Sequence, residues 1–268
     1  MSKYQDLMQR VLRLGENQSD TRSLFGENLV YDLRRNFPIV TSRKIYYKQA
    51  LAELYCFIKG FTDVKSFQKA GVKFWDHDCY KPSWEANHNK RHVDDLGKIY
   101  GFQWRFGFGK DQLVELLINL KAKPESRRHI LSTFNHADLD SMCLPPCYIS
   151  HQFSVREGKF LDMLVHQRSA DLCIGVPYDL VNFATFQMLI ANELGLTARR
   201  LQICFGDVHI YNSHLANAEK QADLQAPYQQ TELIIPKGTK VLEYNPEYVE
   251  LVGYDPLPPI NYDFQVQP

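Results

Sequence analysis

The chain has 268 residues, and its 31 Lys and Arg balance its 31 Asp and Glu, so its formal net charge is zero. With 44% hydrophobic and 23% charged residues it is too apolar for intrinsic disorder, and its length suggests one large domain or two small ones. The balanced charge gives no global attraction to nucleic acid or membranes, and no segment reaches the roughly 18 consecutive apolar residues of a membrane helix.

The first half of the chain mixes helical and strand-like patterns. Apolar residues recur at helical spacing in three segments, and two short segments alternate between apolar and polar residues. In chain order, the expected elements are a helix at 3–14, strands at 24–33 and 36–40, a buried helix at 46–59, a mixed region at 60–110 and a helix at 111–121.

The second half is dominated by strand-like segments around one long apolar helix. A hairpin turn is predicted within VREGK, and Gly195 ends the helix. The expected elements are strands at 129–135, 147–169 and 201–211, a helix at 178–194, and strand and loop from residue 227 onward. We therefore predict a single α+β domain over residues 1–268, with a large mixed sheet covered by helices.

The cysteines do not form a recognisable disulfide or metal pattern. Six cysteines are too few for a disulfide scaffold in a chain of this length, and no second Cys or His pair completes a zinc site with Cys143 and Cys147. The N-terminal residues carry charges among their apolar positions, unlike a signal peptide. We expect a reduced, cytoplasmic protein without a bound metal.

Cys147 is the candidate nucleophile. It follows two prolines in LPPC, which fix the backbone just before a predicted strand. A thiol held there is well placed for attack once neighbouring positive charge favours the thiolate. The alternative is a buried structural cysteine.

Arginines supply candidate anion-binding groups. Arg127 and Arg128 are adjacent, so in a strand they would point to opposite faces and could serve one anion only at a turn or across two subunits. Arg168 lies in QRSAD, where a strand leads through a Gly/Pro turn into a long helix, and it suits bidentate phosphate binding. The alternatives are a solvated pair for the first two and, for Asp179 after the turn, a simple helix N-cap.

These motifs together resemble the thymidylate synthase family. The resemblance covers nearly the whole chain, and its ordered set of motifs is highly specific. The motifs are FPIVTSRK, AELYCFIKGFTD, FWD, YGFQWR, PESRRHILSTFN, LPPC, QRSADLCIGVPYD, GDVHIYNSH and GYDPLP.

The resemblance implies roles for the nucleotide-binding and catalytic residues. Cys147 matches the nucleophile that adds to C6 of the pyrimidine, Glu53 the buried glutamate that moves protons through water, and Tyr100 the tyrosine near the proton leaving C5. The implied nucleotide-binding residues are Arg168, Gln167, Ser169, His209 and Tyr211, with Arg22 as a further phosphate contact and Arg127 and Arg128 supplied by the partner subunit.

The resemblance also implies a folate co-substrate and a dimer. Trp75 matches the tryptophan beside the folate, and Asp171 the residue that contacts its pterin. The co-substrate would be 5,10-methylenetetrahydrofolate, and a homodimer with shared active sites would form through one face of the sheet.

Asp179 departs from the synthase pattern, which has Asn at this position. An Asn amide matches the N3–H donor and O4 acceptor of uracil, whereas a carboxyl that shares one proton matches the N3 acceptor and 4-amino donor of cytosine. Asp at this position is typical of the deoxycytidylate hydroxymethylases. The alternative is that Asn182, one helical turn later, reads the base and restores uracil recognition.

Other departures point the same way. Tyr148 follows the nucleophile where synthases commonly have His, and Asp78 replaces a second tryptophan, so a carboxylate could hold water near the folate. Asp78 could instead be a solvated loop residue. The arginine loop is shortened around Arg22, which puts its role in doubt, and the chain runs past GYDPLP to FQVQP, so a folate-capping C-terminus is not clearly matched.

The sequence therefore predicts transfer of a one-carbon unit to C5 of dCMP as a hydroxymethyl group. Two enzyme alternatives remain: CMP hydroxymethylation, as in nucleoside-antibiotic pathways, and thymidylate synthesis with methyl transfer and dihydrofolate release. A third is a synthase-like protein that binds RNA, which the absence of a basic stripe disfavours and a gel-shift titration across salt concentrations would test.

Overall fold

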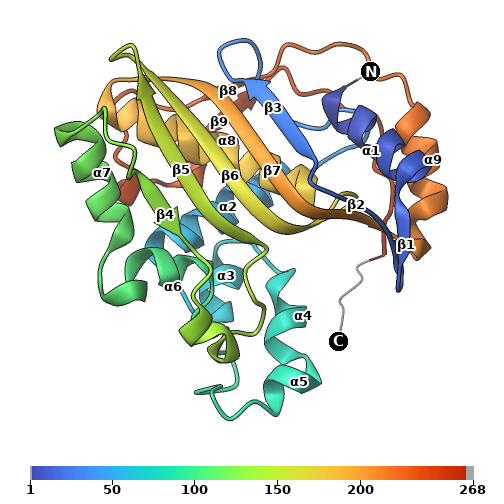
Figure 1. Ribbon diagram of the computed structural model, residues 1–268, viewed down its shortest axis with the longest axis horizontal. Coiled ribbons are helices and arrows are strands. Elements are labelled where there is room, and N and C mark those ends of the chain that lie inside the picture. The colour runs from blue at the N-terminus through green and yellow to red at the C-terminus, as the bar shows by residue number, and fades with distance from the viewer. Residues whose placement is uncertain (1, 264–268) are drawn as a thin grey trace.

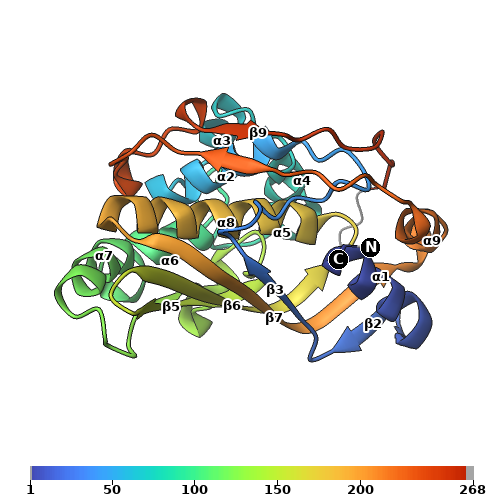
Figure 2. The same ribbon diagram turned by 90° about the horizontal axis from the view of Figure 1, so that it is seen from above.

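The computed structural model describes residues 2–263, in which helices cover one side of a large sheet. Figure 2 shows the sheet below α8 and α2 above it, and in Figure 1 the sheet lies in front of α8. The helices are α1 (Lys3–Leu14), α2 (Tyr47–Lys59), α3 (Val64–Lys69), α4 (Trp75–Tyr80), α5 (Pro82–Glu85), α6 (Tyr100–Arg105), α7 (Gln112–Ala122), α8 (Gly175–Leu194) and α9 (Leu215–Asp223). None of the helices within residues 2–263 has both the length and the apolar character needed to cross a bilayer.

Seven strands of the described chain form the main sheet, in the order β1-β2-β7-β6-β5-β4, with β3 also paired to β7. β6 and β7 are parallel and the other pairs are antiparallel, so the sheet is mixed. The strands are β1 (Glu16–Gln18), β2 (Thr21–Phe25), β3 (Asn28–Asp32), β4 (Ile130–Ser132), β5 (Tyr148–Arg156), β6 (Phe160–Asp171) and β7 (Thr197–Tyr211), and β8 (Glu232–Ile234) pairs with β9 (Glu250–Val252) separately. The expected α+β fold with a large mixed sheet is confirmed.

α8 connects the parallel strands β6 and β7 and forms the centre of the core. It packs on both strands and, on its other side, on α2, which explains why it is apolar nearly all round. Leu180, Phe183 and Phe186 are among its buried residues. Because β5 begins and β6 ends beside the start of α8, the residues before β5, at the end of β6 and in the first turns of α8 meet at one point.

The elements differ from the expectations in a few places. Residues 36–40 are not a strand, because the Phe37 N–H donates to the Thr231 carbonyl and Pro38 has no N–H to offer. α9 was not expected, and α8 begins at Gly175 rather than at Tyr178. Asp179 therefore lies inside the helix and is not its N-cap.

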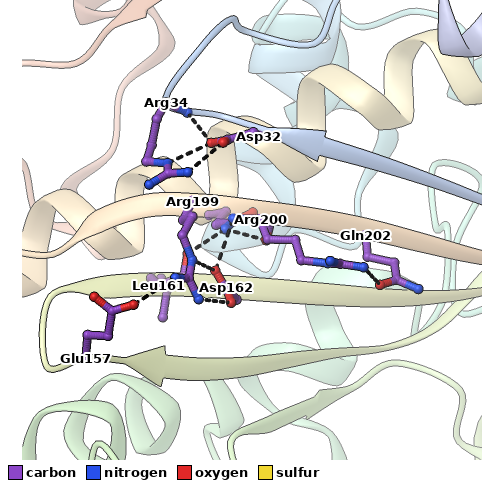
Figure 3. Close-up of polar contacts among 9 residues, drawn as sticks. Asp32, Arg34, Glu157, Leu161, Asp162, Arg199, Arg200 and Gln202 are labelled. Carbon is purple, nitrogen blue, oxygen red and sulfur yellow. Dashed lines mark hydrogen bonds and ion pairs between the residues drawn. The ribbon is translucent and has the colours of Figure 1, made fainter.

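The face of the sheet opposite α8 carries polar networks. Near the β5–β6 turn, the Arg199 guanidinium donates to both carboxylate oxygens of Asp162 at 2.9 and 2.8 Å (Figure 3). Arg34 binds Asp32 in the same two-point way on the neighbouring strand end. The Arg199–Asp162 pair ties β7 to β6, whereas the Arg34–Asp32 pair lies within the end of β3 and the turn that follows it.

Candidate active site

A cavity of about 180 Å³ lies where α2, α4, α6, β5, β6 and α8 meet. Burial of its walls and the presence of titratable groups make it the candidate site. Its lining residues are Glu53, Phe57, Phe74, Trp75, Asp78, Tyr100, Leu144, Cys147, Tyr148, Gln167, Ser169, Asp171, Gly175 and Asp179. Nine residues singled out from the sequence, from Glu53 to Asp179, thus share one cavity.

Cys147 is held rigidly at the edge of this cavity. Its N–H donates to the Tyr100 hydroxyl at 2.8 Å, and its carbonyl accepts from the Arg168 N–H at 2.7 Å. Burial raises the pKa of the Cys147 thiol, while Tyr100 and the Arg168 charge act against this rise. Attack therefore depends on positive charge and on a base near the thiol.

Arg168 is anchored directly beside Cys147. Its guanidinium donates to the Pro146 carbonyl at 2.8 Å and to the Pro145 carbonyl at 3.1 Å, and it lies over the Phe134 ring. The two prolines thus position the nucleophile and also hold the arginine. A guanidinium has five N–H donors, so others remain for an anion.

Glu53 is a buried carboxyl that accepts two side-chain hydrogen bonds. Trp75 Nε1 donates to one oxygen at 2.7 Å, and Asn182 Nδ2 donates to the other at 2.7 Å. Burial raises the pKa of Glu53 to about 7, against the effect of both bonds. A carboxyl that titrates near neutral pH can both give and take a proton.

Glu53→Gln should make stability less dependent on pH. Because the folded state holds the Glu53 proton up to about pH 7, the free energy of unfolding should fall as pH rises from about 4.5 to 7, by up to roughly 3 kcal/mol from this group. Urea unfolding across this range should show a shallower fall in the variant. If the free energy of unfolding of Glu53→Gln fell with pH as steeply as that of the exposed control Glu125→Gln, this result would contradict the raised pKa of Glu53.

Asp179 lies in the second turn of α8 and reaches the same cavity. Gln167 Nε2 donates to Asp179 Oδ2 at 2.7 Å. Burial raises the pKa of Asp179 to about 7, and Gln167 opposes that rise. Asn182 is 4% exposed, does not line the cavity and gives its amide N–H to Glu53. Asp179, and not Asn182, therefore faces the space that a base could occupy.

Asp78 and Asp171 add two more carboxyls to the cavity wall. Asp78 lies in α4 with 5% exposure and forms an ion pair with Lys81 at 3.2 Å, so it is not a solvated loop residue. Burial raises the pKa of Asp78. Asp171, at the end of β6, accepts N–H bonds from Cys173 and Ile174 through one oxygen.

Comparison with known proteins decides the family. The thymidylate synthase family model matches residues 2–266. The chain is 36% identical over 273 residues to a thymidylate synthase from Corynebacterium aurimucosum, covering 98% of this chain and 97% of the relative. It is 34% identical over 279 residues to thymidylate synthase 1/2 from Encephalitozoon cuniculi, covering 96% and 95%.

The chain belongs to the thymidylate synthase family. It is accordingly an enzyme that transfers a one-carbon unit to a pyrimidine nucleotide, and the family uses methylenetetrahydrofolate as co-substrate. The cavity fits such a reaction, because it combines a thiol, several carboxyls with raised pKa values, and aromatic walls.

Some residues that the family resemblance pointed to lie outside the cavity lining. Arg127 and Arg128 are exposed ahead of β4, and neither lines the cavity. Arg22 points toward α1, where its guanidinium donates to the Leu12 carbonyl at 2.9 Å. His209 and Tyr211 lie at the end of β7, and His209 pairs with Asp171 in the parallel register.

The cavity also contains residues to which the sequence gave no role. Tyr148 is 4% exposed and lines the cavity, with its ring 4.4 Å from that of Tyr100. Phe57, Phe74 and Leu144 form the apolar part of the cavity wall. Tyr148 was recognisable as a departure from the synthase pattern, but the other three look like ordinary core residues in the sequence.

One group of described residues offers metal-ligand atoms. The donor atoms of Asp171, Cys173 and His214 lie within 4.8 Å of one another. One Asp171 oxygen already accepts two N–H bonds, and the Arg43 guanidinium donates to the Cys173 carbonyl. A positive charge next to the group disfavours a cation, and the absence of a metal stays a prediction.

Proposed function

We propose that this enzyme converts dCMP into 5-hydroxymethyl-dCMP with release of tetrahydrofolate. The observation that carries the proposal is the position of Asp179. Its carboxyl lines the cavity that contains Cys147, and its pKa is raised by burial to about 7. A carboxyl that holds a proton near neutral pH can donate to N3 of cytosine while its second oxygen accepts from the 4-amino group.

The chemistry at the base begins with Cys147. The thiolate forms a bond to C6, and the electron pair of the C5–C6 double bond moves to C5, N3 and O2 of the ring. Methylenetetrahydrofolate supplies the one-carbon unit that C5 then captures. Tyr100, which binds the Cys147 backbone, is positioned near the proton that leaves C5, and Glu53 moves protons through water.

The final step decides the product. As the C5 proton leaves, the bond between the captured carbon and the folate nitrogen breaks, which releases tetrahydrofolate and leaves an exocyclic methylene on C5. Water adds its hydroxyl to this methylene, giving a hydroxymethyl group, and the water proton and the C5 proton pass to the two folate nitrogens. The electron pair returned to C5 restores the C5–C6 double bond and expels the Cys147 thiolate. Asp78 supports this step, since it is a buried carboxyl on the same cavity wall with a raised pKa. A closed site that excluded water would instead favour hydride transfer and a methyl group.

The co-substrate needs aromatic surface and polar contacts next to the base. Trp75, Phe57 and Phe74 provide rings on the cavity wall, and Asp171 provides a carboxyl. A second cavity of about 320 Å³, lined by Ile174 and Tyr178 among others, follows the start of α8 and gives room for a larger molecule. These residues are the part of the chain that would hold the folate.

Thymidylate synthesis is the second candidate function, and the names of both relatives favour it. It requires that Asp179 accept a uracil base despite its carboxyl. CMP hydroxymethylation is the third candidate, and it ranks below dCMP because His209, Tyr211 and Ser169 match the deoxynucleotide enzymes.

The homodimer is part of the proposal, because Arg127 and Arg128 are exposed and outside the cavity of their own chain. Mixing Arg127→Ala/Arg128→Ala protein with Cys147→Ala protein should restore activity, up to about a quarter of wild type. Hybrid dimers then contain one site with an intact nucleophile and intact arginines. No recovery, despite subunit exchange proven by mass spectrometry of mixed dimers, would mean that the arginines do not act across subunits.

The substrate is tested by offering dCMP, CMP and dUMP separately with methylenetetrahydrofolate. We expect the highest kcat/KM with dCMP and the release of tetrahydrofolate. Turnover of dUMP with dihydrofolate release and little turnover of dCMP would replace the proposal with thymidylate synthesis.

A further inference from the structure

Gln167 is the side chain that binds the base-reading carboxyl. It is 1% exposed at the end of β6, and its Nε2 donates to Asp179 Oδ2 at 2.7 Å. Among residues 2–263, no other side chain donates a hydrogen bond to Asp179. The contact lies inside the cavity that both residues line.

A protonated carboxyl is by itself a poor discriminator between cytosine and uracil. Its two oxygens are chemically equivalent, so the proton can reside on either one. With the proton on one oxygen the group matches the N3 acceptor and 4-amino donor of cytosine. With the proton on the other it matches the N3–H donor and O4 acceptor of uracil. A free acid would therefore accept both bases.

The Gln167 amide removes this equivalence. Because Oδ2 accepts the N–H of Gln167, its lone pair on that side is occupied, and a proton shared with the base is held by Oδ1. Oδ2 keeps one further lone pair for a donor on the base. The Gln167–Asp179 pair then presents its donor at Oδ1 and its acceptor at Oδ2, in a fixed order along the edge that faces the base.

We propose that Gln167 fixes the Asp179 proton on Oδ1 and thereby makes Asp179 able to distinguish cytosine from uracil nucleotides. The inference rests on the proposed function only in taking Asp179 as the base reader. It does not require that cytosine be the preferred base. Gln167 is a positioning residue, since it acts through Asp179.

Other titratable groups surround Asp179. Glu53 on α2, Asp171 at the end of β6, and Cys147 and Tyr148 at the start of β5 all interact with it electrostatically. They change how readily Asp179 ionises but do not select one of its oxygens through a hydrogen bond. Selection of the oxygen is therefore specific to Gln167.

The test compares Gln167→Met with Gln187→Met. Gln187 is a matched control, because it is also a buried glutamine whose Nε2 donates to two acceptors, the carbonyls of Leu161 and Arg200. It lies eight residues beyond Asp179 on α8, about 12 Å along the helix. Kd values for dCMP and dUMP without folate, and kcat/KM values with it, are measured for both variants and wild type.

In Gln167→Met, the ratio of kcat/KM for dCMP to that for dUMP, and the corresponding ratio of Kd values, should each move toward one by at least about fivefold, whichever base the wild type prefers. Gln187→Met should keep the wild-type ratio. A ratio that stays unchanged in Gln167→Met, or that moves equally in both variants, overturns the inference. If Gln167→Met does not fold, Gln167→Asn serves instead, because its shorter amide cannot span the same distance.

The pH profile of kcat/KM gives a second readout, which a packing defect would not shift. Loss of the Gln167 donor removes a bond that favours the ionised form of Asp179, so the limb of the profile due to Asp179 should shift to higher pH. A shift to lower pH would mean that Gln167 accepts the Asp179 proton, and would overturn the proposal. A wild type that prefers dUMP would refute the proposed function and leave both readouts for Gln167 valid.

Discussion

Cys147→Ser and Cys147→Ala are expected to abolish turnover, lowering kcat by at least about a thousandfold. A serine hydroxyl is a much weaker nucleophile at neutral pH than a thiolate, and alanine cannot form the bond to C6. Nucleotide binding should persist, because the Arg168 guanidinium is held by the Pro145 and Pro146 carbonyls and not by the thiol. Steady-state kinetics and nucleotide titration measure the two effects separately.

Cys204→Ser is the matched control for this prediction. Cys204 is a partly exposed free thiol on β7 that does not line the cavity, so its replacement should leave kcat unchanged. Substantial turnover in folded Cys147→Ala protein would remove Cys147 from the mechanism.

Asp179→Asn is expected to reverse the base preference. The substitution keeps nearly the same volume, and the Gln167 amide can turn so that its Oε1, which has no hydrogen-bond partner among residues 2–263, accepts from the new NH2; folding should therefore change little. The amide NH2 then takes the place of Oδ2, where it matches the O4 acceptor of uracil, and the amide oxygen in the place of Oδ1 accepts from N3–H. The ratio of kcat/KM for dCMP to that for dUMP should fall at least about tenfold.

This loss should appear in kcat as well as in KM. Negative charge develops on the N3 side of the ring as the thiolate adds, and a shared proton stabilises that charge more than it stabilises the ground state. Asp78→Asn makes the same chemical change on the same cavity wall and should leave the base preference unaltered. A ratio that Asp179→Asn does not move would show that Asp179 does not read the base.

Much of the fold follows from local sequence patterns. The long helices were predictable because each buries one stripe or, for α8, nearly its whole surface. Residues 36–40 were predicted wrongly because their backbone groups bond to the C-terminal segment, including Thr231 and the Tyr254 hydroxyl, which lies 214 positions from Val40. α9 was not predicted from the sequence because its buried residues, among them Ala218 and Ala222, are small and form a weak apolar pattern.

The site residues could be named from the sequence, but their pairings could not. Asn182 meets Glu53 across 129 positions, and this contact is what leaves Asp179 as the residue facing the cavity. The Gln167–Asp179 contact likewise depends on how β6 enters α8. The C-terminal FQVQP, noted as a departure from the synthase pattern, lies outside the described residues. The roles of Arg22, Arg127 and Arg128 stay predictions, since their chain alone does not bring them to Cys147.

The central claim is tested most directly by the mass of the nucleotide product. The enzyme is given an equimolar mixture of dCMP, CMP and dUMP with methylenetetrahydrofolate, and every product is identified by high-resolution mass spectrometry. The account predicts that dCMP gains CH2O and that the other two nucleotides remain largely unchanged. A gain of CH2 on dUMP, accompanied by dihydrofolate, would contradict it.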